Sequence, residues 1–414
     1  MNETVRPQRV PRAGNPELQG FLGQIVPRLG DARRDETFQS YLDGLLTDHP
    51  NKNCDTLAQI VPETSEQRLQ GLLTTTRWDE REVNERRVKV MRELKTEGDG
   101  VLIFDGTDFP KQGRGSVGVA RQYSGSLGKI ANCQVTVNCH YAERTIAWPV
   151  GTRLYLPKEW TQDRERCEAV YVPDDVVFQT KAEIALDLLD QANGMQVRHS
   201  AVTADAEFGD DPGFLDALEE HRESYVVDVR KDFSVSLGRG AASLVQRAEH
   251  VVAALPKRAW CMLRWRQGHD GTWLKGSFTC IRCWRVEGRG QRTIGWLLAQ
   301  RELPDGSGRT KFLWSNCSAS TPLMRMVEWA HRRYAVEQFH QESKTLLGWD
   351  QYQGRLWQGF HRNSVLVMLA HSFLVWLEWQ NRQSIKLRGR PRGALSPSQG
   401  SQTPLLALSS SLHC

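Results

Sequence analysis

The sequence predicts an α/β protein in which a mixed sheet is flanked by helices. Between residues 99 and 230, apolar runs typical of strands alternate with segments of helical periodicity. The 414 residues are 39% hydrophobic, which is enough for a sizeable core and argues against disorder as the main state. We expect neither a signal peptide nor a membrane span, because no sufficiently long apolar stretch occurs. The net charge of +5 permits a nucleic-acid partner without requiring one.

Residues 1–95 are predicted to form a helical N-terminal domain that binds DNA. Apolar residues recur at helical spacing in 38–48, and two further helices, 53–61 and 65–78, are separated by a tight break. Ser65 is placed to cap the second of these helices. The outline fits a helix-turn-helix, but any small helical bundle gives the same pattern, so both interpretations stay open.

Residues 96–230 are predicted to hold the first part of a catalytic core, in the order strand, strand, strand, helix, strand, helix, strand. These elements are the run ending at Asp105, 133–142, 145–157, 182–193, 200–209, 214–221 and 223–230.

The remainder divides into three parts by composition. Residues 231–320 are rich in Arg, Gly and Trp with strand-like runs, and are predicted to be an all-β insertion. Residues 321–380 return to helical periodicity and are predicted to complete the core. Residues 381–414 form a basic, polar tail that is partly disordered in this prediction.

Two acids follow buried runs directly, which suggests a site. Asp105 follows VLIF and Asp205 follows AVTA. A strand fixes the direction of the side chain that ends it, so a strand-end carboxylate suits a divalent cation. Either acid alone fits equally a turn or helix cap.

A third acid lies in the segment 332–348, which is predicted to be one helix. Arg333, Glu337 and Lys344 share a face of that helix. The pattern fits an exposed stripe of ion pairs. It also fits a carboxylate for a metal ion flanked by two cations for phosphates, and with two strand acids this gives the ligands needed for two ions.

These motifs carry a resemblance to a known family. DGTDFPKQG, GKIANCQVTV and TADAEFGDD, followed by the spacing R-x3-E-x6-K, resemble the DDE transposases of bacterial insertion sequences, most closely the insertion-sequence 701 family of the Y-R-E-K group. The resemblance implies an RNase H-like core with a β-rich insertion. It implies cleavage of transposon ends and transfer of their 3′-hydroxyls into target DNA, with two Mg²⁺ (or Mn²⁺) ions. It further implies a homodimer in a synaptic complex and a location in the bacterial cytoplasm, associated with the nucleoid.

Carried over residue by residue, the resemblance assigns catalysis and metal binding to Asp105, Asp205 and Glu337. Arg333 and Lys344 match the cations that contact DNA.

The sequence departs from the family pattern at two places. Ala330 stands where the signature has a tyrosine, and Tyr334 is a candidate substitute. Gly106 stands where a second acid often follows the first, and Asp108 comes two residues later as a rival of Asp105 for the first ligand.

Basic residues outside the helix supply further DNA contacts in this prediction. Residues 106–129 form a glycine-rich loop, which is equally consistent with a solvated hairpin, and its cations are Lys111, Arg114, Arg121 and Lys129. In the tail, Arg388 and Arg390 belong to KLRGRPRG, which fits an AT-hook or a generic basic tail.

Other features favour the plain interpretation. Cys280 and Cys283 form the one CxxC, without a second pair for zinc, and scattered thiols favour a reducing compartment. Most tryptophans are expected to be core, with Trp314 a candidate for stacking on a flipped base. Two other functions remain possible: a catalytically silent DNA-binding regulator, and a nuclease that cuts without joining.

Overall fold

The computed structural model describes residues 15–26, 32–94, 98–240, 242–268, 271–287, 290–301 and 308–387. The two tail arginines, Arg388 and Arg390, therefore lie outside the described residues. None of the helices in these ranges is long and apolar enough to cross a membrane. The cysteines in the same ranges are all free thiols.

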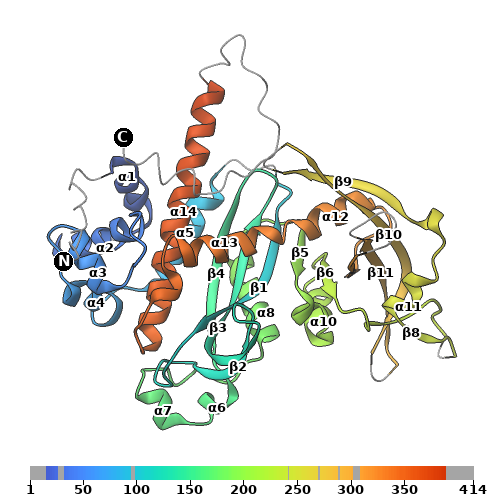
Figure 1. Ribbon diagram of the computed structural model, residues 1–414, viewed down its shortest axis with the longest axis horizontal. Coiled ribbons are helices and arrows are strands. Elements are labelled where there is room, and N and C mark those ends of the chain that lie inside the picture. Colours follow the sequence, from blue (N-terminus) through green and yellow to red (C-terminus); the bar gives the residue numbers. More distant parts are fainter. Residues whose placement is uncertain are drawn as a thin grey trace, which may run out of the picture.

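The N-terminal part is helical, as predicted. Its helices are α1 (Pro16–Ile25), α2 (Ala32–Leu45), α3 (Cys54–Ile60), α4 (Glu66–Thr74) and α5 (Glu80–Arg92). Ser65 Oγ accepts a hydrogen bond from the Arg68 amide and caps α4, and Asn53 caps α3 in the same way. These helices lie beside the long helix α14 (Trp357–Leu387) (Figure 1). The buried Tyr41 hydroxyl donates to Asn363 of α14 at 2.9 Å.

A five-stranded sheet forms the centre of the molecule. Its strands are β1 (Val101–Pro110), β2 (Ala120–Ser124), β3 (Lys129–Ala142), β4 (Ala147–Tyr155) and β5 (Ala201–Ala204). The order is β2-β3-β1-β5, and β4 also pairs with β3. Strand β1 is antiparallel to β3 and parallel to β5, so the predicted mixed sheet is confirmed.

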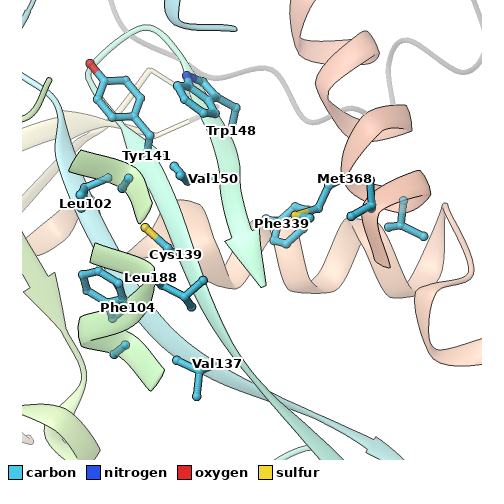
Figure 2. Packing of buried hydrophobic residues seen from close by; sticks show 14 of the residues in the cluster. Leu102, Phe104, Val137, Cys139, Tyr141, Trp148, Val150, Leu188, Phe339 and Met368 are labelled. Carbon is cyan, nitrogen blue, oxygen red and sulfur yellow. The ribbon is translucent and has the colours of Figure 1, made fainter. Parts of the chain in front are cut away.

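Helices cover both faces of this sheet. On one face, Leu102 and Phe104 of β1 point toward Leu188 of α8 (Lys181–Gly194), as Figure 2 shows. Helix α10 (Pro212–Glu220) packs on the same side, where Phe214 meets Phe104 edge to face. On the other face lie α14 and α13 (Tyr334–Thr345), the latter with Phe339 in the core. Short helices complete this part: α6 (Lys158–Thr161), α7 (Arg164–Glu168) and α9 (Ala206–Gly209).

The predicted insertion forms a second, seven-stranded sheet with β6 (Val226–Val229). Its other strands are β7 (Ser234–Ser236), β8 (Val245–Arg247), β9 (Cys261–Gln267), β10 (Trp273–Val286), β11 (Arg292–Arg301) and β12 (Thr310–Ser315). The insertion also contains a short helix, α11 (Ala248–Ala253), and a 3₁₀ turn (Lys257–Ala259). A parallel bridge between Val202 and Tyr225 joins the two sheets edge to edge.

The helix predicted for 332–348 is shorter in the structure, where it corresponds to α13 (Tyr334–Thr345) and excludes Arg333. Helix α12 (Leu323–His331) ends before Arg333, and α13 begins at Tyr334. Gly348 follows α13 in the left-handed conformation and leads into a 3₁₀ turn (Trp349–Gln351). Arg333 therefore lies at the bend between two helices and not within a continuous one. Helices α12 and α13 run from the second sheet across the first (Figure 1).

Candidate active site

Strand periodicity brings three aspartates to one face of the joined sheets. In β1, Val101 and Ile103 face a small core formed with α12, and Asp105 follows them at the same spacing of two. Asp205 follows Ala201 of β5 in the same manner, and Asp228 follows Val226 of β6. All three acids consequently lie on the side covered by α12 and α13.

Asp105 and Asp205 lie on neighbouring parallel strands. Asp205 follows the end of β5, as predicted, but β1 continues to Pro110, so Asp105 lies inside its strand and the prediction that it ends the strand is wrong. The register pairs Phe104 with Ala204, so the two aspartates are the next residues on their strands. Asp205 also caps α9, because its Oδ1 accepts from the Glu207 amide at 3.0 Å. Asp105 is 8% exposed and its Oδ1 accepts from the Gly106 amide at 2.9 Å. The structure thus brings together the two strand acids that the sequence predicted as a pair.

Glu337 is linked to Asp105 through Arg333, which forms an ion pair with each; Asp105, Asp205, Glu337 and Arg333 are called the acid cluster below. Arg333 Nη2 lies 2.5 Å from Glu337 Oε1, and Arg333 Nη1 lies 3.2 Å from Asp105 Oδ2. The bend before α13 directs the guanidinium at the sheet, while the first turn of α13 presents Glu337. The side chain of Glu337 remains 48% exposed, so the cluster opens to solvent on that side.

The pKa values of Asp105 and Asp205 are both raised, by burial and by repulsion from neighbouring acids. Burial, with the charges of Asp205 and Glu337, raises the pKa of Asp105 to about 7 despite the opposing charge of Arg333. Burial and the charge of Glu207 likewise raise the pKa of Asp205. Strongly shifted pKa values of buried acids that lie together are common at functional sites.

The donor set suits a hard divalent cation, since carboxylate oxygens are the ligands that Mg²⁺ and Mn²⁺ prefer. In the described ranges, however, no three His, Cys, Asp or Glu side chains are arranged to hold a metal ion. At the acid cluster, Arg333 contacts both Asp105 and Glu337. A divalent cation on these carboxylates therefore requires Arg333 to release them. No zinc site is found at Cys280 and Cys283 within the same ranges.

Asp108, the rival first ligand, has a different task in the structure. Its carboxylate accepts hydrogen bonds from Ser124 Oγ at 2.5 Å, Ser126 Oγ at 2.7 Å and the Ser126 amide at 3.1 Å. Burial would raise its pKa, but these bonds outweigh burial and hold the pKa below its usual value. Asp108 thus anchors the turn between β2 and β3, and Lys344 Nζ donates to its backbone carbonyl at 2.7 Å.

The predicted DNA-contacting cations fall into two groups. Arg114, Arg121 and Lys129 are exposed, the latter two on the paired strands β2 and β3. Lys111 and Lys344 are engaged inside: Lys111 Nζ donates to the Tyr352 carbonyl at 2.5 Å, and Lys344 packs over the Phe109 ring. Burial lowers the pKa of both lysines.

The structure also locates the tryptophan proposed for base stacking and the position where the family signature has a tyrosine. Trp314 is fully buried in β12 against Phe233, so the idea that it stacks on a flipped base is wrong. Ala330, which stands where the signature has a tyrosine, is buried in the small core that α12 forms with the sheets. Tyr334 is 45% exposed, with the Arg266 guanidinium 4.7 Å from its ring centre.

Sequence reasoning missed Asp228. Its Oδ2 lies 2.9 Å from Lys311 Nζ and 3.4 Å from Arg333 Nε, and its charge contributes to the raised pKa of Asp205. The signal was present, because YVVD is an apolar run ending in an acid, like VLIFD and AVTAD.

Comparisons with known proteins give two family matches and a relative. Residues 24–272, more than half of the chain, match the family model of the DDE superfamily endonucleases, and residues 179–373 match a transposase DDE domain. The chain is 26% identical over 238 residues to a probable transposase for insertion sequence element IS701 from Microchaete diplosiphon. The aligned part is 57% of this chain and 55% of that protein, so the chain spans about half the length of this relative.

Proposed function

The chain belongs to the DDE superfamily of endonucleases and insertion-sequence transposases, and on this premise we propose that it is an active DNA transposase. In this proposal it cuts the ends of a mobile element and transfers their 3′-hydroxyls into target DNA. The relative from Microchaete diplosiphon is named a probable transposase, which supports this proposal. The partners are the terminal inverted repeats and the target duplex, held by a homodimer in the bacterial cytoplasm at the nucleoid.

The chemistry proposed is in-line displacement at phosphorus. In cleavage, a water oxygen attacks the phosphorus and the bond to the 3′-oxygen breaks, which leaves a 3′-hydroxyl. In joining, that hydroxyl attacks a target phosphodiester and releases a new 3′-hydroxyl. Asp105, Asp205 and Glu337 are proposed to hold two divalent ions, Mg²⁺ or Mn²⁺, which supply charge stabilisation to the attacking and leaving oxygens.

The observation that supports this proposal is that Arg333 contacts both Asp105 and Glu337, which come from distant parts of the chain, while Asp205 lies on the strand next to Asp105. Asp105 and Asp205 follow the paired residues Phe104 and Ala204, and the charge of Glu337 acts on Asp105. A merely structural acid, such as Asp108, has its oxygens satisfied by hydrogen bonds. Asp105 and Asp205 differ from it, because burial and, after it, the charges of neighbouring acids raise their pKa values, which is common at functional sites.

Arg333 and Lys344 are proposed to contact the phosphates beside the acids. Both cations lie on the side of the sheet that α13 covers, on either side of Glu337 along the chain. Arg121 and Lys129 extend this positive charge along the β2–β3 ribbon, whose turn is tied to β1 by Asp108. Arg388 and Arg390 are proposed to add non-specific affinity through the tail.

The test is cleavage and joining of DNA that carries the element's ends, with Mg²⁺ or Mn²⁺. We expect metal-dependent cutting and joining by the wild type, and a loss of at least about 10³-fold in Asp205→Ala and Glu337→Gln. Glu328→Gln is the matched control, because Glu328 is a helical glutamate of α12 that pairs loosely with Arg325 at 3.9 Å. It should retain activity.

Each other outcome has a clear meaning. Binding without any metal-dependent cutting by the wild type would support the regulator and reject the enzyme. Cutting without joining would support the nuclease. Full cutting by Asp205→Ala and Glu337→Gln would reject the assignment of the site.

A further inference from the structure

Asp228 is a buried carboxylate beside the proposed site that the proposed chemistry does not use. It is 8% exposed on β6, on the same face as the strand acids. Its Oδ1 atom is buried without a hydrogen-bond partner in the part of the chain that the structure describes. Its Oδ2 atom forms two ion pairs, with Lys311 at 2.9 Å and with Arg333 at 3.4 Å. Retaining such a group costs free energy, so it calls for an explanation.

Arg333 divides its guanidinium among three carboxylates, one for each nitrogen. Nη1 meets Asp105 at 3.2 Å, Nη2 meets Glu337 at 2.5 Å, and Nε meets Asp228 at 3.4 Å. Burial would lower the pKa of Arg333, but the acids outweigh burial, and Asp228 makes the largest contribution among them. Asp228 is therefore a principal electrostatic partner of this arginine.

The three carboxylates are not equivalent once a divalent cation is considered. Asp105 and Glu337 are the proposed ligands, so both would be released from Arg333 when they hold a cation. Asp228 is then the remaining carboxylate among its three ion-pair partners. With the Asp228 contact intact, the guanidinium stays beside the cluster, with its two Nη atoms free to meet a phosphate, for which its planar fork is suited.

Asp228 is itself held by the second sheet. β12 pairs with β6 in antiparallel register, with Leu313 opposite Asp228. Lys311 lies two residues from Leu313, so its side chain emerges on the same face, diagonal to Asp228. The Lys311 ion pair thus connects the insertion to the position of Arg333.

We propose that Asp228 is a positioning residue that retains Arg333 at the active site when Asp105 and Glu337 bind a divalent cation. This inference rests on the proposed function and adds a role for the insertion, which fixes Asp228 through Lys311. A buried ion pair of purely structural importance would affect folding but not the catalytic parameters of the folded protein.

The test is a double-mutant cycle with Asp228→Asn, Arg333→Gln and the combination. Two quantities are measured on each full-length protein: Mn²⁺ binding by titration calorimetry, and kcat and KM for end cleavage at saturating Mn²⁺. We expect Asp228→Asn to lower kcat about tenfold or more with KM within about twofold, and to weaken Mn²⁺ binding, because Arg333 then stays on the ligands. In the Arg333→Gln background, Asp228→Asn should add less than about twofold to either quantity.

Asp210→Asn is the matched control. Asp210 pairs at 2.7 Å with Nε of Arg230, the residue that follows β6, and its described ion pair does not involve Asp105, Glu337 or Arg333. It should leave both quantities unchanged. If Asp228→Asn does not fold because Lys311 loses its partner, the combination with Lys311→Met removes both charges of that pair and replaces it in the cycle.

Three results would overturn the inference. Unchanged Mn²⁺ binding and kcat in Asp228→Asn, with an active wild type, would reject it and leave the proposed function standing. Effects of Asp228→Asn and Arg333→Gln that multiply would show that Asp228 acts independently of Arg333, as a ligand or through its charge alone. A wild type that neither binds Mn²⁺ nor cuts would overturn the proposed function and this inference together.

Discussion

Arg333 Nη2 lies 2.5 Å from Glu337 Oε1, across one turn at the start of α13. The pair looks like an ordinary helical ion pair in the sequence, yet the same guanidinium also reaches Asp105 on β1. A contact that is local in the chain is therefore part of a non-local one. It joins the helical side of the site to the sheet, and it places positive charge where three acids would otherwise repel one another.

Replacing Arg333 with lysine tests whether cleavage needs the forked shape of the guanidinium group or only its positive charge. The Arg333→Lys variant keeps a cation, but a single ammonium group cannot meet three carboxylates in the observed geometry. We expect end-DNA affinity to stay within a few-fold and the cleavage rate to fall about 10- to 100-fold, because misplacement of a catalytic group carries a penalty of that order. Single-turnover cleavage with saturating protein measures this. A cleavage rate equal to that of the wild type would show that charge alone suffices.

Asp108 and Asp105 should respond differently to loss of the carboxylate. Asp108→Ala removes three hydrogen bonds that tie down the β2–β3 turn, so we expect a loss of about 1–3 kcal/mol in the free energy of unfolding. Cleavage by the folded fraction should keep its Mg²⁺ dependence. Asp105→Ala should abolish cleavage. Denaturant unfolding and a Mg²⁺ titration of cleavage measure both effects. The reverse pattern would make Asp108 the first ligand.

Gly209 is placed where no side chain fits. A Cβ on this residue would collide with the backbone carbonyl of Asp228, which a small rotamer change cannot relieve. We expect Gly209→Ala to lower the free energy of unfolding by about 1–3 kcal/mol, as overpacking does, and to lower cleavage by shifting β6. Gly194→Ala at the end of α8 is the control, because its Cβ meets nothing within 4 Å. Equal stability of the two variants in urea would contradict the prediction.

The sequence predicts those site residues that a local pattern reveals, and it misses those whose role depends on contacts with residues distant in the chain. Asp105 and Asp205 are visible because each directly follows an apolar run in the sequence, and parallel pairing of β1 with β5 then aligns them. Asp228 carries the same signal, but its importance depends on Arg333 and on Lys311, contacts between strands and helices distant in sequence. The break between α12 and α13 was missed because helical periodicity continues through it. It is tertiary packing that turns Arg333 toward the sheet.

The β2–β3 ribbon should contribute to DNA affinity through phosphate contacts. Arg121 and Lys129 are exposed on the paired strands, so their charges are available to a DNA backbone. If each neutralises one phosphate, the double variant Arg121→Ala/Lys129→Ala should reduce the slope of log K against log salt by about 1.8. Fluorescence anisotropy between low and moderate salt measures the slope. Arg222→Ala, an exposed arginine in the loop after α10, is the control for a change in net charge. An unchanged slope in the double variant would exclude the ribbon from the DNA path.

Buried histidines should make the protein sensitive to mild acid. His140 is 1% exposed, and burial together with the charges of His371, His340 and Arg87 holds its pKa well below the usual value. Its neutral form is favoured in the fold, whereas the unfolded chain takes up a proton below about pH 6.5. The stability it contributes is therefore complete above about pH 6.5 and is lost as the pH falls toward its folded pKa, by about 1.4 kcal/mol per pH unit. We expect His140→Phe, which packs on Phe339 without titrating, to reduce the fall in unfolding free energy between pH 6 and 5 by about that amount.

His199 has the opposite effect on the pH dependence of stability. Burial would lower its pKa, but its hydrogen bond to Glu223 at 2.9 Å raises it. Its contribution is present below about pH 6.5 and lost as the pH rises, so His199→Asn should cost more stability at pH 5.5 than at pH 8. Urea unfolding at both ends of the range measures the two variants, and parallel pH profiles for wild type and His140→Phe would contradict the role assigned to His140.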